Sequence, residues 1–186
     1  MNARAAALRE EQVRLGLWMF LATVTMLFAA FTSAYIVRRA GSDWRPVALP
    51  SILWWNTLAL AASSVSVEYA AYAGNRRRWT LALGAMLVAL KLGFVFLGGQ
   101  VVAWREMMQA GVYLQSNPHS SFFFMMTGAH AAHIAAALAV LAWGAVQTWR
   151  AAREPQGWPA AFALARTFWH FLGFVWVFLF ALVSLY

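Results

Sequence analysis

The sequence predicts an all-α membrane protein, built as one bundle of five transmembrane helices. Of its 186 residues, 63% are hydrophobic and only 11% are charged. A soluble domain of this size needs more polar surface to cover its core. The apolar residues gather in five runs, each close to or above the roughly 20 residues that a helix needs to cross a bilayer. Loops with Gly, Pro, Asn and Arg separate the runs, as expected outside lipid.

Cysteine and charge exclude several other classes. The chain has no cysteine, so a disulfide framework, a thiolate metal site and a thiol nucleophile are all excluded. The net charge of +8 could suggest nucleic acid as a partner. However, the arginines cluster at the ends of the apolar runs, which is typical of membrane topology signals and not of a nucleic-acid-binding face.

The first run covers about Leu15–Val37. A basic start, an apolar stretch and the small residues "TSA" also fit a cleavable signal peptide. The stretch from Leu15 is nevertheless long enough to span, and Arg38 and Arg39 follow it directly. We therefore expect it to remain as the first transmembrane helix.

Four further runs complete the predicted bundle. They cover about Ser51–Ala73, Trp79–Val102, Ser121–Gln147 and Phe162–Tyr186. No internal repeat of 20–50 residues and no linker divides the chain. The whole sequence, residues 1–186, is therefore predicted to be a single domain.

The distribution of arginine predicts the orientation. The N-terminal segment, the loop "GNRRR" and the loop "TWRAAREPQGWPA" lie on one side with eight arginines, against four in the two loops on the other side. The side with more arginine usually faces the cytoplasm. We therefore expect a cytoplasmic N-terminus and a periplasmic Tyr186. Tryptophans near the predicted helix ends fit an interfacial belt: Trp44, Trp54, Trp55, Trp79, Trp104, Trp149 and Trp158.

Two charged residues of opposite sign lie inside predicted spans. Lys91 is near the middle of the third span, and Glu68 lies about 9 Å from the cytoplasmic end of the second. A lysine stem can bend several Å toward a carboxylate, so we expect a structural ion pair. A proton or ion path is the alternative, but it would need more groups than one pair.

Three histidines also lie inside spans. His133 and His170 are both roughly 12 Å from the cytoplasmic ends of the fourth and fifth helices, so their rings could face one another. Two imidazoles at one depth are what a haem iron needs. Packing is the favoured interpretation, because small residues line this helix and neutral His can bond to a neighbouring hydroxyl or carbonyl. We expect His130, His133, His170 and Thr127 to be packing and hydrogen-bonding residues.

A cluster of basic residues lies on the predicted cytoplasmic side. Arg76, Arg77 and Arg78 close a very short loop and would fix the topology. Together with Arg166, they are also candidates to hold anionic lipid head groups.

Five segments, one in each span, carry a resemblance to a known family. "SSFFFMMTGAHAAH" is similar to the Thr-Gly-x-His-x-x-His signature of subunit III of haem–copper oxidases. "FWHFLGFVWVFLF" resembles the last helix of that family and "GLWMFLATVTMLF" its first motif. Weaker similarities are "WWNTLALAASSVSVE" and "FLGGQVVAW". They occur in the family's order over nearly the whole chain.

The sequence also departs from the family pattern. Three acidic positions of the family align with Val24, Ala103 and Gly173, so roles given to those acids do not carry over. The length matches a five-helix form, without the two extra N-terminal helices that help to build a lipid cleft in longer members.

The resemblance implies a supporting subunit of a terminal respiratory oxidase in the bacterial inner (plasma) membrane. It implies that this chain binds no haem or copper, that these cofactors lie in subunits I and II, and that subunit I is the main partner. Phospholipids are expected as ligands, and nucleic acid is not. The alternatives are a subunit III-like accessory of a quinol oxidase or nitric oxide reductase, a free-standing b-type cytochrome, and a small transporter, for which the membrane-embedded polar groups are too few and no inverted repeat is seen.

Overall fold

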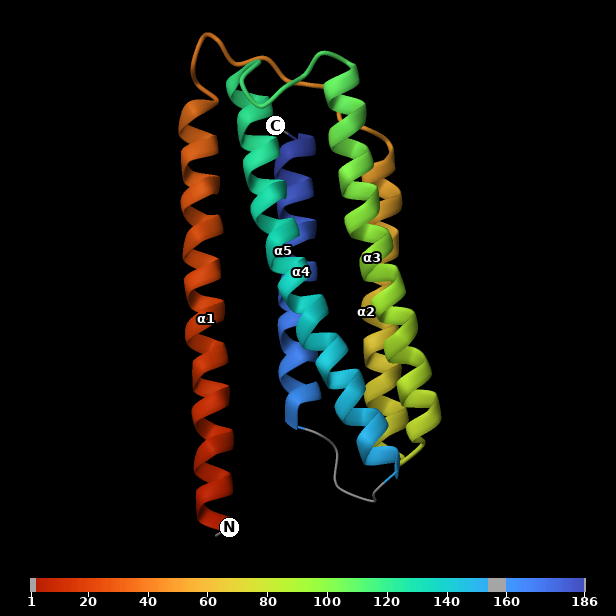
Figure 1. Ribbon diagram of the computed structural model, residues 1–186. Helices are drawn as coiled ribbons and strands as arrows, with labels where there is room; N and C mark the ends of the chain where they lie inside the picture. The colour runs from red at the N-terminus through yellow and green to blue at the C-terminus, as the bar shows by residue number, and fades with distance from the viewer. Residues whose placement is uncertain (1–2, 154–159, 186) are drawn as a thin grey trace.

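The computed structural model describes residues 3–153 and 160–185, and these form five helices in one bundle (Figure 1). The helices are α1 (Ala3–Arg38), α2 (Ile52–Asn75), α3 (Trp79–Gln109), α4 (Pro118–Arg153) and α5 (Ala160–Leu185). Each predicted span falls on one helix, so the all-α prediction is confirmed. Tyr186 and Trp158 lie outside the described residues.

Successive helices run in opposite directions. The N-terminus and the α2–α3 turn lie at the lower end of the bundle as drawn, and the α1–α2 and α3–α4 loops lie with the C-terminus at the upper end (Figure 1). Within the described residues, four helices are long and apolar enough to cross a membrane: α1, α3, α4 and α5. The remaining helix, α2, lacks such an apolar stretch because Asn, Thr, Ser and Glu are spread along it, yet it lies alongside α3 (Figure 1).

The helices extend beyond the predicted spans. α1 begins near residue 3 instead of 15, α3 ends at Gln109 instead of Val102, and α4 ends at Arg153 instead of Gln147. The added segments are rich in Ala, Leu, Arg, Glu and Met, which are strong helix formers. A run of apolar residues therefore marks the part inside lipid and not the end of the helix.

The turn between α2 and α3 is only three residues long. The Arg78 amide donates to the Ala73 carbonyl at 2.9 Å and the Arg77 amide to the Gly74 carbonyl at 2.8 Å, which is the Schellman pattern of a helix C-terminus. Arg77 has a φ of 56°, in the left-handed region that usually takes Gly. This geometry folds α3 straight back onto α2.

The connection from α3 to α4 is closed by two local motifs. Gly111, with a φ of 77°, ends α3 in a second Schellman motif. Asn117 then caps α4: the Ser120 amide donates to Asn117 Oδ1 at 3.1 Å and the Asn117 amide to Ser120 Oγ at 3.2 Å. This reciprocal pair, with Pro118 at the first helical position, is a capping box.

The core lies between α2, α3, α4 and α5. Small residues let these helices approach closely: a Cβ on Gly93 of α3 would lie 2.5 Å from Leu138 and 2.7 Å from Trp169. The Ser63 hydroxyl of α2 donates to the Ala89 carbonyl of α3 at 3.0 Å and fixes the register of this pair.

The first helix is attached through one narrow stripe. Its buried apolar side chains are Leu21, Val24, Phe28 and Tyr35, and the helix stands beside the others (Figure 1). Phe20 makes an edge-to-face contact with Phe168 of α5 at 5.4 Å between ring centroids. α1 therefore leaves most of its surface free.

Candidate functional site

A cluster of three ionisable side chains joins α2 to α5. Glu68 of α2 accepts hydrogen bonds from Arg166 Nε at 2.7 Å, from Arg166 Nη2 at 2.5 Å and from His170 Nε2 at 2.6 Å. Arg166 and His170 are four residues apart, so they project from one face of α5. The bidentate guanidinium–carboxylate geometry is the strong form of this ion pair. We call these three residues the α2–α5 ion cluster.

The ion cluster is half-exposed on the outside of the chain. The side-chain exposure is 45% for Glu68, 44% for Arg166 and 36% for His170. If His170 is neutral, the Glu68 and Arg166 charges cancel; if it is protonated, the cluster carries one positive charge. The arrangement can therefore tie two helices together while its charge depends on a single imidazole.

The structure gives Glu68 other partners than the predicted Lys91. The Ser63–Ala89 hydrogen bond sets the antiparallel register of α2 and α3, and it places Lys91 level with residue 61. Glu68 is seven residues further along α2, or about 10 Å at 1.5 Å per residue. The lysine side chain is too short to bridge both this offset along the helix axis and the distance between the two helices. The expected Glu68–Lys91 pair is therefore replaced by the α2–α5 ion cluster.

His133 and His170 contact different helices. His133 Nδ1 donates to the Ala129 carbonyl of its own helix at 2.7 Å. Its ring lies 5.7 Å from Phe28 and 6.4 Å from Phe20, both on α1. His170 instead bonds to Glu68 on α2. The two rings thus serve separate contacts, although they were expected to be able to face each other.

His130 lies in an aromatic enclosure at the centre of the bundle. The residue has 0% exposure, and its ring centroid is 5.3 Å from Trp176, 5.9 Å from Phe96 and 6.2 Å from Phe28. Neither ring nitrogen has a hydrogen-bond partner among the described residues. Trp176 in turn donates to Thr57 Oγ1 at 3.0 Å. His130 therefore contributes to packing between four helices.

Thr127 makes two hydrogen bonds one turn before His130. It accepts from Trp104 Nε1 of α3 at 3.0 Å and donates to the Phe123 carbonyl at 2.7 Å. A hydroxyl can do both at once. Thr127 thus satisfies the indole of Trp104 and connects α3 to α4.

The predicted lipid-binding arginines separate into two groups. Arg76, Arg77 and Arg78 are exposed at the lower end of the bundle, where the Arg76 guanidinium lies 4.6 Å from the centroid of the Tyr72 ring. Arg166 is held by Glu68. The lower-end arginines are thus better placed than Arg166 to meet a head group.

Several buried polar residues were not anticipated. Asn56, Gln100 and His119 have exposures of 3%, 1% and 1%. Asn56 and Gln100 are not ionisable, and His119 lies just before the predicted fourth span, so none of the three was singled out. The sequence feature that could have indicated the burial of the two amides is their position, since each lies on the stripe of its helix that faces the core.

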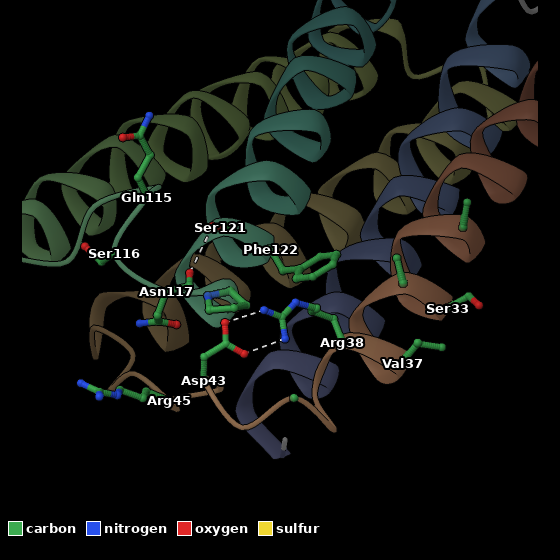
Figure 2. A pocket seen from close by; sticks show the side chains of 14 residues that line it. Ser33, Val37, Arg38, Asp43, Arg45, Gln115, Ser116, Asn117, Ser121 and Phe122 are labelled. Atoms are coloured by element: carbon green, nitrogen blue, oxygen red, sulfur yellow. Dashed lines mark hydrogen bonds and ion pairs between the residues drawn. The ribbon is translucent and has the colours of Figure 1, made fainter.

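The upper end holds an open cavity of about 1310 Å³ between α1, the loop after it and the start of α4. Figure 2 shows Arg38 pointing at Asp43, with hydrogen bonds of 2.8 Å and 2.5 Å. The Arg38 guanidinium holds the pKa of Asp43 below its ordinary value. Asn117 and Arg45 lie nearby (Figure 2). This pair links the end of α1 to its loop.

Val24, Ala103 and Gly173 stand where the family that the sequence resembles has acidic residues, and all three lie against other parts of this chain. Val24 and Ala103 are 2% and 0% exposed, and a Cβ on Gly173 would lie 3.7 Å from Ser64 Oγ. The intramembrane charge of this chain is therefore concentrated in the α2–α5 ion cluster and at Lys91.

The fold and these contacts define a multi-pass helical membrane protein whose polar groups inside the bundle mainly join one helix to another. The segments that carry the resemblance lie on all five helices, and several of their polar residues make these contacts.

The chain belongs to the cytochrome c oxidase subunit III family, whose model matches residues 3–186. It is 32% identical over 186 residues to cytochrome c oxidase subunit 3 of Thermostichus vulcanus, covering 91% of this chain and 85% of that protein. It is 30% identical over 192 residues to cytochrome c oxidase subunit 3 of Corynebacterium diphtheriae, covering 95% and 90%. A probable quinol oxidase subunit 3 of Staphylococcus saprophyticus is 28% identical over 176 residues, covering 91% and 87%. The family prediction is confirmed, and members of this family work within haem–copper oxidase complexes.

Proposed function

We propose that this chain is a supporting subunit that holds a respiratory haem–copper oxidase together and carries no redox centre itself. The observation that carries this proposal is the placement of the two candidate axial ligands. His133 bonds to its own helix and contacts α1, whereas His170 bonds to Glu68 on α2. Both imidazoles therefore act between helices of this chain, and haem and copper would lie in its partner subunits.

The proposed partners are oxidase subunit I, as the main contact, and subunit II. The outward apolar side chains of the bundle are what a contact with other transmembrane helices or with acyl chains requires. The electron donor is either cytochrome c or a quinol, and the related proteins carry both names.

The proposed location is the bacterial inner membrane, with a cytoplasmic N-terminus. The structure brings the segments that contain the eight arginines to the lower end, and those with four to the upper end. This asymmetry supports the orientation. Phospholipid head groups would be held at the lower end by Arg76, Arg77 and Arg78. A reporter that is active only in the cytoplasm, fused after Tyr186, should stay silent; activity there would reverse the orientation.

The supporting role is tested by replacing both candidate ligands with Gln, which keeps hydrogen-bonding capacity. The complex is purified through a tag on this chain, and haem is measured per mole of chain for the parent and for the His133→Gln, His170→Gln variant. We expect oxidase subunits to co-purify, with equal haem content in both samples, and no Soret band from the chain expressed alone. A haem-dependent Soret band in the isolated chain that the double replacement abolishes would instead identify a b-type cytochrome.

A further inference from the structure

Lys91 is a charged residue in the middle of an apolar helix. The segment between Arg78 and Arg105 contains no other charged residue, and Lys91 lies about halfway along it, some 20 Å of helix from either end. The four-carbon lysine stem is much shorter than this distance. The ammonium group therefore cannot reach the interfacial region on either side of the hydrocarbon layer.

No acidic residue in the part of the chain that the structure describes pairs with Lys91. Five of the six acidic residues, all except Glu68, lie outside the predicted spans. Glu68 is about 10 Å further along the bundle and is held by Arg166 and His170. Among the described residues, no ion pair includes Lys91, and its side chain is exposed on the outer surface of α3. A charge at this depth is costly unless it faces a partner or water.

The surface around Lys91 is shaped to admit another helix. Gly84 and Gly98 lie seven residues before and after Lys91, on the same face of α3. A Cβ added to either glycine would meet nothing within 4 Å, so both positions are open to the outside. Exposed apolar side chains such as Val88 and Phe94 flank this face. Small residues at such spacing allow close approach of a second transmembrane helix.

We propose that the Gly84–Lys91–Gly98 face of α3 is the docking surface for a transmembrane helix of a different subunit, which supplies an Asp or Glu to pair with Lys91 near the bilayer midplane. A second copy of this chain does not fit, because two parallel copies meeting at this face would place Lys91 opposite Lys91. A lipid phosphate does not fit either, because it remains at the interface, roughly 15 Å away. This inference rests on the proposed function, since it needs a partner subunit.

The first test compares the isolated chain with the assembled complex. In the isolated chain, Lys91→Met removes an uncompensated charge and should leave thermal stability unchanged or raised. In the complex, Lys91→Met and Lys91→Glu should weaken retention of this chain, with an apparent dissociation constant raised roughly tenfold or more, whereas Lys91→Arg should stay close to the parent. Equal retention of all four chains would overturn the proposal.

The second test uses the two glycines and a matched control. Gly84→Leu and Gly98→Leu should reduce retention in the complex, because the new side chain occupies the space of the docked helix. Gly16→Leu on α1 is the control, since its Cβ also meets nothing within 4 Å, and it should have no effect. If the α3 variants behave like Gly16→Leu, no helix lies close to this face.

The third test identifies the partner residue. A photoreactive amino acid at position 91 is activated in the assembled complex, and the cross-linked peptide is sequenced. We expect a transmembrane peptide with Asp or Glu within one helical turn of the cross-link, and exchange of that acid for Lys should rescue Lys91→Glu. Cross-links to lipid alone, or to a peptide without an acid, would overturn the inference and leave the proposed function intact. Absence of oxidase subunits from the complex would instead overturn the proposed function.

Discussion

Replacing Glu68 with Gln removes the only negative charge of the α2–α5 ion cluster and keeps the side-chain shape. Arg166 and His170 together direct three N–H groups at this carboxylate. Gln offers one acceptor oxygen and turns an NH2 group toward the remaining donors. About one charge-assisted hydrogen bond, worth about 1.5–3 kcal/mol, is lost, and the Arg166 charge becomes unpaired.

The exposure of the cluster limits the size of this effect. All three side chains are more than a third exposed, so part of the Arg166 charge can be solvated when Glu68 is absent. We expect a loss of about 2 kcal/mol, between the values for surface and buried ion pairs. For a chain of this length, that corresponds to a melting temperature lower by about 4–8 °C.

The assay is thermal unfolding of the purified chain in detergent, followed by tryptophan fluorescence. Glu106→Gln is the control, because Glu106 is exposed near the end of α3. The double variant Glu68→Gln, Arg166→Met should lose less than the two single changes add up to, whereas Glu68→Gln and Lys91→Met should be additive. The reasoning is refuted if Glu68→Gln loses no more than Glu106→Gln, or if Lys91 shows the coupling expected of Arg166.

Three further outcomes follow from local geometry. Arg38 lowers the pKa of Asp43 below its ordinary value of 3.8, so the pair contributes stability above that pH and loses it as the pH falls through the lowered value. The melting temperatures of the parent and of Asp43→Asn should therefore differ at pH 7 and converge in acid. A constant difference would argue against the pair. Arg77→Gly relieves a left-handed residue and should raise stability by up to about 1 kcal/mol, whereas Arg76→Gly, at a φ of −94°, should not raise it in thermal unfolding. Gly99→Ala places a Cβ 1.9 Å from Asn56 Oδ1 and should cost about 1–3 kcal/mol, while Gly98→Ala should be neutral or stabilising; equal melting temperatures for these two variants would show that the α2–α3 contact is looser than described.

Hydrophobic patterning predicted the helices because each run is long and bounded by charged or turn-forming residues. It did not predict their ends: Ala3–Arg14 is helical although it is polar, since Ala, Leu, Arg and Glu stabilise a helix wherever they lie. Arg166, in the first turns of the fifth span, was predicted to hold a lipid head group. Its spacing of four residues from His170 was the sequence feature that indicates that both side chains project from one face of the helix.

The partners of Glu68 could not be predicted, because they depend on how helices rotate and slide against each other. Depth along separate spans made Lys91 look reachable, but the Ser63–Ala89 contact sets a register that separates the two charges. His133 and His170 likewise share a depth, yet a shared depth does not determine which neighbour each ring faces. The burial of Asn56 and Gln100 likewise depends on how the helices rotate and slide against each other.

The three-residue turn at Arg76–Arg78 has a consequence for biogenesis. Among the described residues, α2 is the one helix without a stretch apolar enough to cross a membrane, because Asn56, Ser63 and Glu68 lie along it, and on its own it would partition poorly into lipid. Its turn is too short for α3 to enter the bilayer much later than α2, so the two helices should enter as one hairpin with the Ser63–Ala89 hydrogen bond already formed. Lengthening this turn with a flexible Gly/Ser insert should lower the fraction of α2 that becomes protected in a membrane-insertion assay. Unchanged protection would mean that α2 inserts without help from α3.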